Sequence, residues 1–370
     1  MNNVIHINLF IFPIILILGM IFSTRDVPKN RRNYIIIVTL LLMLECAFRG
    51  LSVGSDTSNY YNMFFHTSNM SWSEIWDSFV GRYIYGTDEN DIGYTVMVKL
   101  ISLFTSSWSA FVFIAQLTFF VPLGVLLYRH ANRMIELIFA FVLYVSLFHI
   151  IALSGGRQLY AMGLCIAALL LYERDKMKYA VGCMLIAITI HMSALLFFIP
   201  YLLNRFNGGF VKKFHLVSFG LVPFILLETN SIIIFMGNMV GSEKYAEYGM
   251  GEVQGGAWTF ISLLLFISMF CYLSIPKHIL DDRQDVKQFY VMAPLFTIFG
   301  PLIHSNGTMI RISMYFHIFL LLLIPMAINY GYKKNANILY YLMIAVLLFL
   351  SLRGGGFEYK FIWDDHIPAY

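Results

Sequence analysis

The composition of this 370-residue chain excludes a soluble globular protein, because 59% of its residues are hydrophobic and only 12% are charged. Soluble domains carry about 25% charged residues. The net charge of +4 is modest, and nothing in its distribution favours a nucleic-acid partner. Apolar stretches recur from Val4 to Leu352. We therefore expect one integral membrane domain over residues 1–370, with the lipid bilayer as its surroundings.

Hydropathy predicts an all-α, polytopic transmembrane helical bundle of about 10–12 membrane segments. The first apolar stretch follows no basic residue and precedes no small-residue cleavage site, so it is interpreted as a retained span rather than a signal peptide. The candidate spans are residues 4–22, 34–49, 108–128, 135–153, 157–172, 214–228, 257–275, 289–304, 311–329 and 336–352.

Two further apolar segments do not fit a simple series of spans. Residues 92–104 are shorter than the roughly 20 apolar residues that a span needs, and Lys99 lies in their middle. They predict a re-entrant or interfacial helix. Residues 179–203 lie between two basic loops and are interrupted at His191, which predicts a broken helix.

The basic residues between the spans predict the orientation of the chain. Loops rich in Lys and Arg are expected in the cytoplasm. The longer loops with few basic residues are then expected outside. They comprise a first outer loop with short helices over residues 50–107, in which residues 50–91 form the outer-face loop proper, and a second outer loop over residues 229–256.

The first outer loop carries polar residues that either cap helices or perform chemistry. Asp56 lies in a small, polar stretch before Tyr60, which is typical of a turn leading into a helix. Asp56 is interpreted as an N-cap or, alternatively, as a general base or sugar-hydroxyl acceptor. Glu89 and Asp91 precede the short helix, where a carboxylate serves equally as a cap or as a catalytic group.

Arg157 is the sharpest single signal in the sequence. It interrupts two long apolar runs with almost no loop between them. An unpaired arginine at this depth costs at least ~2.5 kcal/mol, so it needs a structural partner or an anionic ligand. The preceding Gly155 and Gly156 allow close approach of a ligand to the backbone, and the helix start favours phosphate.

Two other polar breaks in apolar sequence are candidates for the same site. His191 is interpreted either as a satisfied interhelical hydrogen-bonding group or as a functional residue. Arg311 follows a polar turn and begins a helix, with Tyr315 one turn further on. Two arginines on one side of the membrane are suited to clamp a pyrophosphate by bidentate hydrogen bonds.

The sequence predicts neither a metal site nor another cofactor. The four cysteines lie inside apolar runs and lack the spacing of metal ligands or of a disulfide framework. Asp364, Asp365 and His366 in the tail are crowded together without further matched ligands. No nucleotide-binding glycine motif occurs.

Taken in order, these residues resemble the EpsG family of bacterial polysaccharide polymerases, which are related in role to the Wzy O-antigen polymerases. The chain departs from the family pattern at Asp91 and Ile92, where Glu and Pro are usual, and at Gly155 and Gly156, where bulkier residues are common. The resemblance is carried by Arg49, Gly54, Asp56, Thr57, Tyr60, Asp91, Gly93, Tyr94, Arg157, Gln158, His191, Ser193, Arg311, Tyr315 and Pro368.

The resemblance implies polymerisation of undecaprenyl-pyrophosphate-linked oligosaccharide repeats at the periplasmic face of the bacterial inner membrane, without nucleotide sugar or metal. A chain-length regulator protein is a further expected partner. The alternatives are a transporter or flippase of lipid-linked glycans, an O-antigen ligase and a membrane acyltransferase. The implied roles are acceptor activation by Asp56 or His191, orientation of sugar hydroxyls by Asp91, pyrophosphate binding by Arg157 and Arg311, and sugar binding by Tyr60, Tyr94, Gln158 and Tyr315.

Overall fold

The structure, a computed structural model, describes residues 5–86, 91–240, 249–250, 257–353 and 358–364. It is an all-α helical bundle, which confirms the predicted fold class. Within the described residues, the strands are β1 (Ile5–His6) and β2 (Glu358–Tyr359), which pair antiparallel. The chain groups into two compact units, unit 1 with residues 1–194 and 337–370, and unit 2 with residues 195–336. This grouping does not test the prediction of one membrane domain, which stays a prediction.

Several helices are long and apolar enough to cross a bilayer. By length and composition, four stretches of the described chain meet this requirement, at residues 108–130, 208–227, 284–304 and 333–353. Residues 307–317 and 320–331, bent by 55° relative to each other, form a fifth crossing if they count as one span. Shorter apolar helices of 10–17 residues accompany them. The protein is therefore a multi-pass membrane protein.

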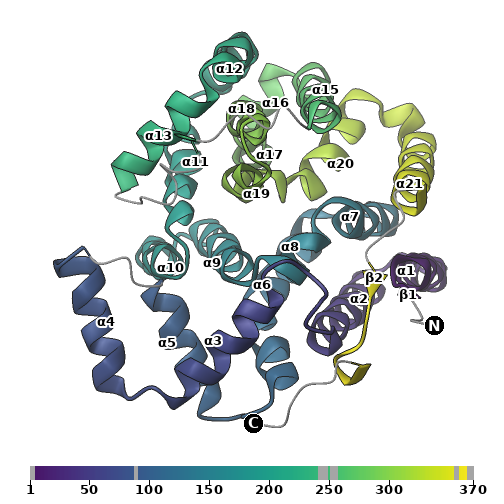
Figure 1. Cartoon of the computed structure of the whole chain (residues 1–370). Helices are drawn as coiled ribbons and strands as arrows, with labels where there is room; N and C mark the ends of the chain where they lie inside the picture. The colour runs from purple at the N-terminus through teal and green to yellow at the C-terminus, as the bar shows by residue number, and fades with distance from the viewer. Residues whose placement is uncertain (1–4, 87–90, 241–248, 251–256, 354–357, 365–370) are drawn as a thin grey trace. The chain divides into compact units, whose positions relative to one another are not determined.

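The helices of unit 1 are α1 (Asn8–Ser23), α2 (Pro28–Phe48), α6 (Trp108–His130), α7 (Met134–Leu147), the short α8 (His149–Ser154), α9 (Gly156–Tyr172), α10 (Met177–Ile190) and α21 (Ala336–Arg353), apart from the helices between α2 and α6. Helix α9 packs between α6 and α10, while α2 packs against α6 and α1 packs against α7 (Figure 1). The predicted span 135–153 is interrupted at Phe148 and forms two helices, α7 and α8.

Three short helices occupy the segment between α2 and α6. They are α3 (Thr57–Asn69), α4 (Trp72–Ile84) and α5 (Ile92–Ser102). Helix α5 lies between the other two (Figure 1). Its 11 residues are too few to cross a bilayer, as predicted. Lys99 in α5 donates a hydrogen bond of 2.7 Å to the Ser68 carbonyl, so its charge meets the C-terminal end of α3, where a cation is favourable.

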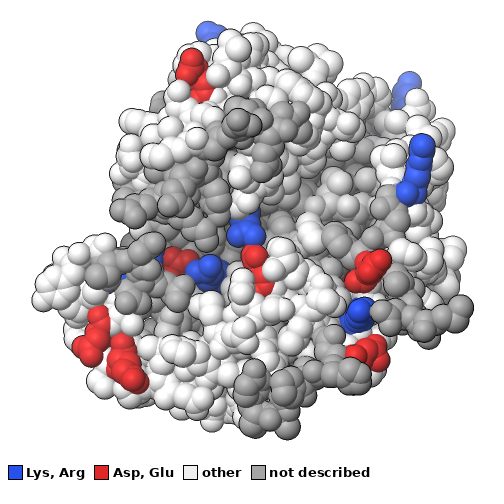
Figure 2. All heavy atoms as spheres, in the orientation of Figure 1, with Lys and Arg blue, Asp and Glu red and all other residues white. Residues whose placement is uncertain are grey.

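Helix α4 is amphipathic and begins with a capping box. The Ser71 hydroxyl accepts a hydrogen bond from the Glu74 amide, and the Glu74 carboxylate accepts one from the Ser71 amide. These hydrogen bonds hold the pKa of the Glu74 carboxyl below its usual range. Trp72 and Trp76 are exposed on the same helix. On the face shown in Figure 2, acidic side chains gather over α4, while most of the surface is uncharged.

The predicted break in the apolar segment 179–203 is confirmed. Helix α10 ends at Ile190, and His191 has an extended backbone. The chain continues as a 3-10 helix, η1 (Met192–Phe197), and a short helix, α11 (Phe198–Leu203). Unit 1 ends within η1, at Ala194. The break at His191 therefore adjoins the change from one unit to the other.

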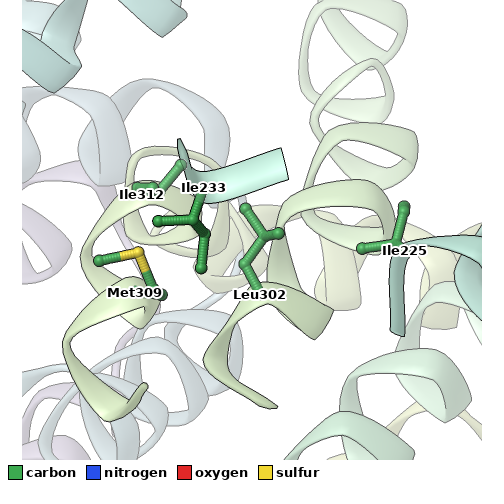
Figure 3. Packing of buried hydrophobic residues seen from close by; sticks show 5 residues of the cluster. All are labelled: Ile225, Ile233, Leu302, Met309 and Ile312. Carbon is green, nitrogen blue, oxygen red and sulfur yellow. The ribbon is translucent and has the colours of Figure 1, made fainter. Parts of the chain in front are cut away.

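The helices of unit 2 surround a small apolar core. They are α12 (Gly208–Leu227), α13 (Thr229–Val240), α15 (Trp258–Ser274), α16 (Lys277–Asp282), α17 (Gln284–Tyr290), α18 (Met292–Phe299), η2 (Gly300–His304), η3 (Gly307–Met309), α19 (Ile310–His317), α20 (Leu320–Gly331) and η4 (Lys333–Asn335). Five buried side chains, Ile225, Ile233, Leu302, Met309 and Ile312, gather from five of these elements (Figure 3). This core fixes the start of α19, which carries Arg311. Residues 241–248 and 251–256 of the predicted second outer loop lie outside the described residues.

A chain of buried hydrogen bonds also crosses unit 2. His215 in α12 bonds the Tyr290 hydroxyl and the Ser268 hydroxyl, each at 2.7 Å, and Ser268 bonds Thr297 at 2.5 Å. Polar side chains that satisfy one another in this way stabilise helix contacts inside a membrane. We interpret this chain as the connection that holds α12, α15, α17 and α18 together.

We expect Gly163→Ala to lower thermal stability, because a Cβ at Gly163 would collide with the α6 backbone at Thr118 and Phe119. Overpacking of this kind costs about 1–3 kcal/mol. Gly182→Ala is the matched control, since nothing in the described protein lies within 4 Å of its added Cβ, and alanine is the better helix former. Melting of both variants in detergent, followed by size-exclusion chromatography, tests the contact. Equal melting temperatures would contradict it.

Candidate functional site

The loop before α3 is fixed against the end of α8. Gly54 has a φ of +90°, and a Cβ there would collide with the Leu153 carbonyl. The Thr57 hydroxyl lies 3.0 Å from the same carbonyl and accepts a hydrogen bond of 3.3 Å from Arg49 Nε. Arg49 is buried and donates a second hydrogen bond to the Cys46 carbonyl. A guanidinium group at the end of α2 thus holds the loop that carries Asp56.

Asp56 occupies the N-cap position of α3, but its side chain makes no capping hydrogen bond. Its Oδ1 accepts a hydrogen bond of 3.3 Å from the Ser55 hydroxyl. Ser55 in turn bonds Ser154 Oγ through its amide and its hydroxyl, at 3.1 and 2.8 Å. The half-buried Asp56 is therefore held beside the last residue of α8, three positions before Arg157. The capping interpretation of its carboxylate is wrong.

Asp91 lies between two arginines. It occupies the N-cap position of α5 without a capping hydrogen bond. Its Oδ2 accepts a hydrogen bond of 3.2 Å from Arg157 Nη1, and its Oδ1 lies 3.4 Å from Arg82 Nη2. The capping interpretation is wrong here as well. The carboxylate instead supplies the partner that the sequence required for Arg157.

Arg157 is the second residue of α9, and its guanidinium group lies near the ring of Tyr60. Its guanidinium carbon lies 5.9 Å from the centroid of the Tyr60 ring, within the range of a cation–π contact. Its buried Nε has no hydrogen-bond partner among the described residues. Gly156 needs no special backbone conformation, and a Cβ there would make ordinary contacts. The protein atoms around Gly156 therefore do not require glycine at this position. The close approach of a ligand to its backbone stays a prediction.

The proposed sugar-binding residues of unit 1 are buried. Tyr94 lies between Tyr60 and Tyr160, with ring centroids 5.7 and 6.4 Å away, and only 1% of Tyr94 is exposed. Gln158 is buried as well. In this structure the rings act as packing beneath the arginine. Their binding of sugar stays a prediction.

The start of α5 packs directly on the last turn of α10. A Cβ at Gly93 would collide with the α10 backbone at Ile190. Asp91 precedes Gly93 by two residues, and His191 follows Ile190, so Asp91 and His191 belong to the same junction. The half-buried His191 bonds the Ser193 hydroxyl through Nδ1 at 2.5 Å. The structure thus brings the segments of Asp56, Asp91, Arg157 and His191 together within unit 1.

Arg311 and Tyr315 belong to unit 2. A turn closed by Asn306, whose side chain accepts a hydrogen bond of 2.8 Å from the Thr308 amide, precedes them. Arg311 is half-buried at the second residue of α19, and Tyr315 is buried one turn later. The local pattern of turn, arginine and helix is as predicted. A shared diphosphate clamp with Arg157 stays a prediction.

The sequence reasoning missed Arg82. This residue lies in the last turn of α4, seven positions after the buried Ile75, and two helical turns place these residues on the same face. That spacing is a signal, but an arginine on an amphipathic helix is usually solvated. Only the fold shows that Arg82 reaches the carboxylate of Asp91.

A second missed feature is a buried hydrogen bond between the side chains of Glu45 and His149. Glu45 Oε2 lies 2.6 Å from His149 Nε2, and both side chains are almost fully buried. Glu45 belongs to α2, which ends before Arg49, and His149 begins α8, which ends at Ser154. The pair therefore joins the two helices that position the Asp56 loop.

Some residues singled out in the sequence lie outside the described residues. They are Glu89, Asp365, His366 and Pro368. Within the described part of the chain, no three His, Cys, Asp or Glu side chains form a group that could hold a metal ion.

A family model described as the EpsG family matches residues 32–354. The matched region contains every candidate site residue discussed above. No curated protein and no solved structure matches the chain.

We expect Thr57→Val to destabilise the protein by about 1–3 kcal/mol, because it leaves the buried Arg49 Nε and the Val53 and Leu153 carbonyls, which share the hydroxyl, without this partner. Thr57→Ser keeps the hydroxyl and is the control. Thermal unfolding of both variants in detergent is the measurement. If the serine variant melts as early as the valine variant, the hydroxyl does not fix the loop.

Proposed function

Because the chain belongs to the EpsG family, we propose that it is a membrane glycosyltransferase that polymerises undecaprenyl-pyrophosphate-linked oligosaccharide repeat units. The observation that carries the proposal is the half-buried Arg157, which has a carboxylate partner and an unsatisfied Nε at the start of a membrane helix. A guanidinium group at a helix N-terminus is suited to a phosphate ligand.

The main catalytic requirement of this reaction is to stabilise the negative charge that develops on the diphosphate leaving group. An acceptor hydroxyl oxygen attacks the anomeric carbon of the donor sugar, and the bond from that carbon to the phosphate oxygen breaks. The electron pair leaves with the lipid diphosphate, and the hydroxyl proton passes to a base. Fixed cations in a site with little water stabilise this developing charge, which is usually the largest catalytic contribution.

The candidate residues fit these roles by their chemistry. Arg157 binds the diphosphate, and Arg311 is the second proposed cation for it. Asp56 or His191 accepts the proton of the acceptor hydroxyl, since each side chain is half-buried next to the end of a helix. Asp91 orients sugar hydroxyls, and Tyr60, Tyr94, Gln158 and Tyr315 are proposed to line the path of the sugars.

The distribution of basic loops supports an active face on the periplasmic side of the bacterial inner membrane. The segment with α3, α4 and α5 follows a loop poor in basic residues, and it carries Asp56 and Asp91. A chain-length regulator protein is the proposed partner. A flippase would leave the repeat unit unchanged, a ligase would transfer the glycan to lipid A, and an acyltransferase would acylate the glycan. The product therefore separates these alternatives.

We expect purified protein, given synthetic undecaprenyl-pyrophosphate-linked repeat units, to form a ladder of longer glycans. Excess EDTA is expected to leave the ladder unchanged, because the proposed charge stabilisation uses guanidinium groups. Gel separation of the products, with and without chelator, is the measurement. Unextended repeat units would exclude a polymerase, and loss of the ladder in EDTA would show that a metal ion takes part.

We expect Arg157→Lys to reduce polymerisation by roughly 10²-fold, the cost of removing one donor to the transition state. Lysine keeps the charge but loses the planar fork that fits phosphate. Arg129→Lys is the matched control, since Arg129 is similarly exposed and pairs with Glu173 at 3.0 Å, away from the candidate site residues in the sequence. Polymer length in cells with equal protein levels is the measurement. Normal length in the Arg157 variant would contradict the assignment.

A further inference from the structure

Asp91 shares its two carboxylate oxygens between two guanidinium groups. The nitrogen–oxygen distances are 3.2 Å to Arg157 and 3.4 Å to Arg82. Tight guanidinium–carboxylate hydrogen bonds are about 2.7–2.9 Å long. Both nitrogen–oxygen distances to Asp91 are longer than this range.

The three charged side chains have an excess of positive charge. Two guanidinium groups face one carboxylate, and the exposed fractions of the side chains are 26% for Arg157, 23% for Arg82 and 16% for Asp91. Partial burial strengthens the attraction between these cations and an incoming anion. Arg157 Nε is buried without a hydrogen-bond partner in the described residues. An oxygen ligand would satisfy this buried donor only after the side chains packed around it move apart.

Helix α4, which carries Arg82, is suited to lie at the membrane surface. Trp72 and Trp76 are 49% and 62% exposed, and Ile84 is 67% exposed. Tryptophan is enriched where membrane meets water, and an amphipathic helix with such side chains lies in that interface. A lipid diphosphate has its phosphates at the same depth. Arg82 therefore stands on a helix suited to that depth, and it is the basic residue of a helix whose other charged side chains are Glu74 and Asp77.

We propose that Arg82, in addition to the cations named above, is a ligand for the lipid diphosphate and that the diphosphate displaces Asp91 from both Arg82 and Arg157. This inference rests on the proposed function, and it adds an order of events. A phosphate group presents oxygen atoms that match the guanidinium fork as a carboxylate does. In the substrate-free protein Asp91 occupies that place. Once the donor is bound, the released carboxylate accepts a hydrogen bond from a hydroxyl of the sugar next to the diphosphate.

A purely structural ion pair makes a different prediction for each residue. If Arg82 only holds α4 on α5, loss of its charge weakens folding and leaves affinity for the diphosphate unchanged. If Asp91 competes with the diphosphate, loss of its charge increases the affinity. The opposite signs expected for Arg82 and Asp91 distinguish exchange from a structural link.

The experiment titrates the full-length protein, in lipid nanodiscs, with undecaprenyl diphosphate by calorimetry. We expect Arg82→Gln to weaken binding by about tenfold or more, and Asp91→Asn to tighten it. In the double variant the gain from Asp91→Asn is expected to shrink, because the two residues are coupled. Arg129→Gln is the control for a lost arginine charge, and Arg82→Lys is a second variant that keeps the charge if the glutamine variant misfolds.

Each outcome decides between the two proposals. Unchanged affinity in folded Arg82 variants, or weaker binding in Asp91→Asn, overturns the exchange even if the wild type makes polymer. The expected affinities without any polymer would keep the exchange and overturn the proposed function, since binding is measured without turnover. Equal affinity of the wild type for undecaprenyl monophosphate would show that the second phosphate is not recognised and would overturn the role of Arg82.

Discussion

A guanidinium group removed from water needs a negative partner, and the ion pair between Arg157 and Asp91 meets this need in unit 1. The rest of the site follows from that constraint. Asp91 is the N-cap residue of α5, so the ion pair joins the starts of α5 and α9. Arg82 in the last turn of α4 shares the carboxylate. Charged groups from α4, α9 and the start of α5 thus meet at one carboxylate.

The ion pair would not position a substrate unless its surroundings were rigid. The loop that carries Asp56 is held by Thr57 and Ser55 against the last turn of α8. Glu45 and His149 join α2 to the other end of that short helix. On the opposite flank, Gly93 lets α5 dock on the α10 backbone. The charged groups thus stand on helix ends that packing and hydrogen bonds fix, which is what precise electrostatic stabilisation requires.

The sequence predicted the residues and segments that differ from their neighbours in polarity or length. Arg157 and His191 interrupt apolar runs, so hydropathy identifies them, and the short helix before α6 is apparent from its length. Arg82 agrees with its surroundings, as one charge on an amphipathic helix, and hydropathy gives it no weight. The two capping assignments failed for a related reason. Local sequence identifies the N-cap positions of Asp56 and Asp91, but it cannot show that tertiary partners take their side chains.

The bend between α19 and α20 also could not be predicted from local sequence. Residues 307–317 and 320–331 read as one apolar run, yet they differ by 55° in direction. Arg311 stands on the first arm of that bend. Its neighbours Met309 and Ile312 pack in one core cluster with Ile225, Ile233 and Leu302. The helix start that carries Arg311 is therefore held by side chains that are far from it in sequence.

Storage of Asp91 in an ion pair has a chemical consequence beyond stability. In the proposed exchange, the ion pairs keep the negative charge of Asp91 from repelling the donor before it binds. While both arginines hold it, the carboxylate offsets part of their positive charge. The diphosphate then replaces one anion by another and gives the arginines a ligand of greater charge. The carboxylate is then released into a site that already contains the sugar. Donor binding and preparation of the catalytic groups thus become one event, which keeps the carboxylate from acting before a repeat unit is in place.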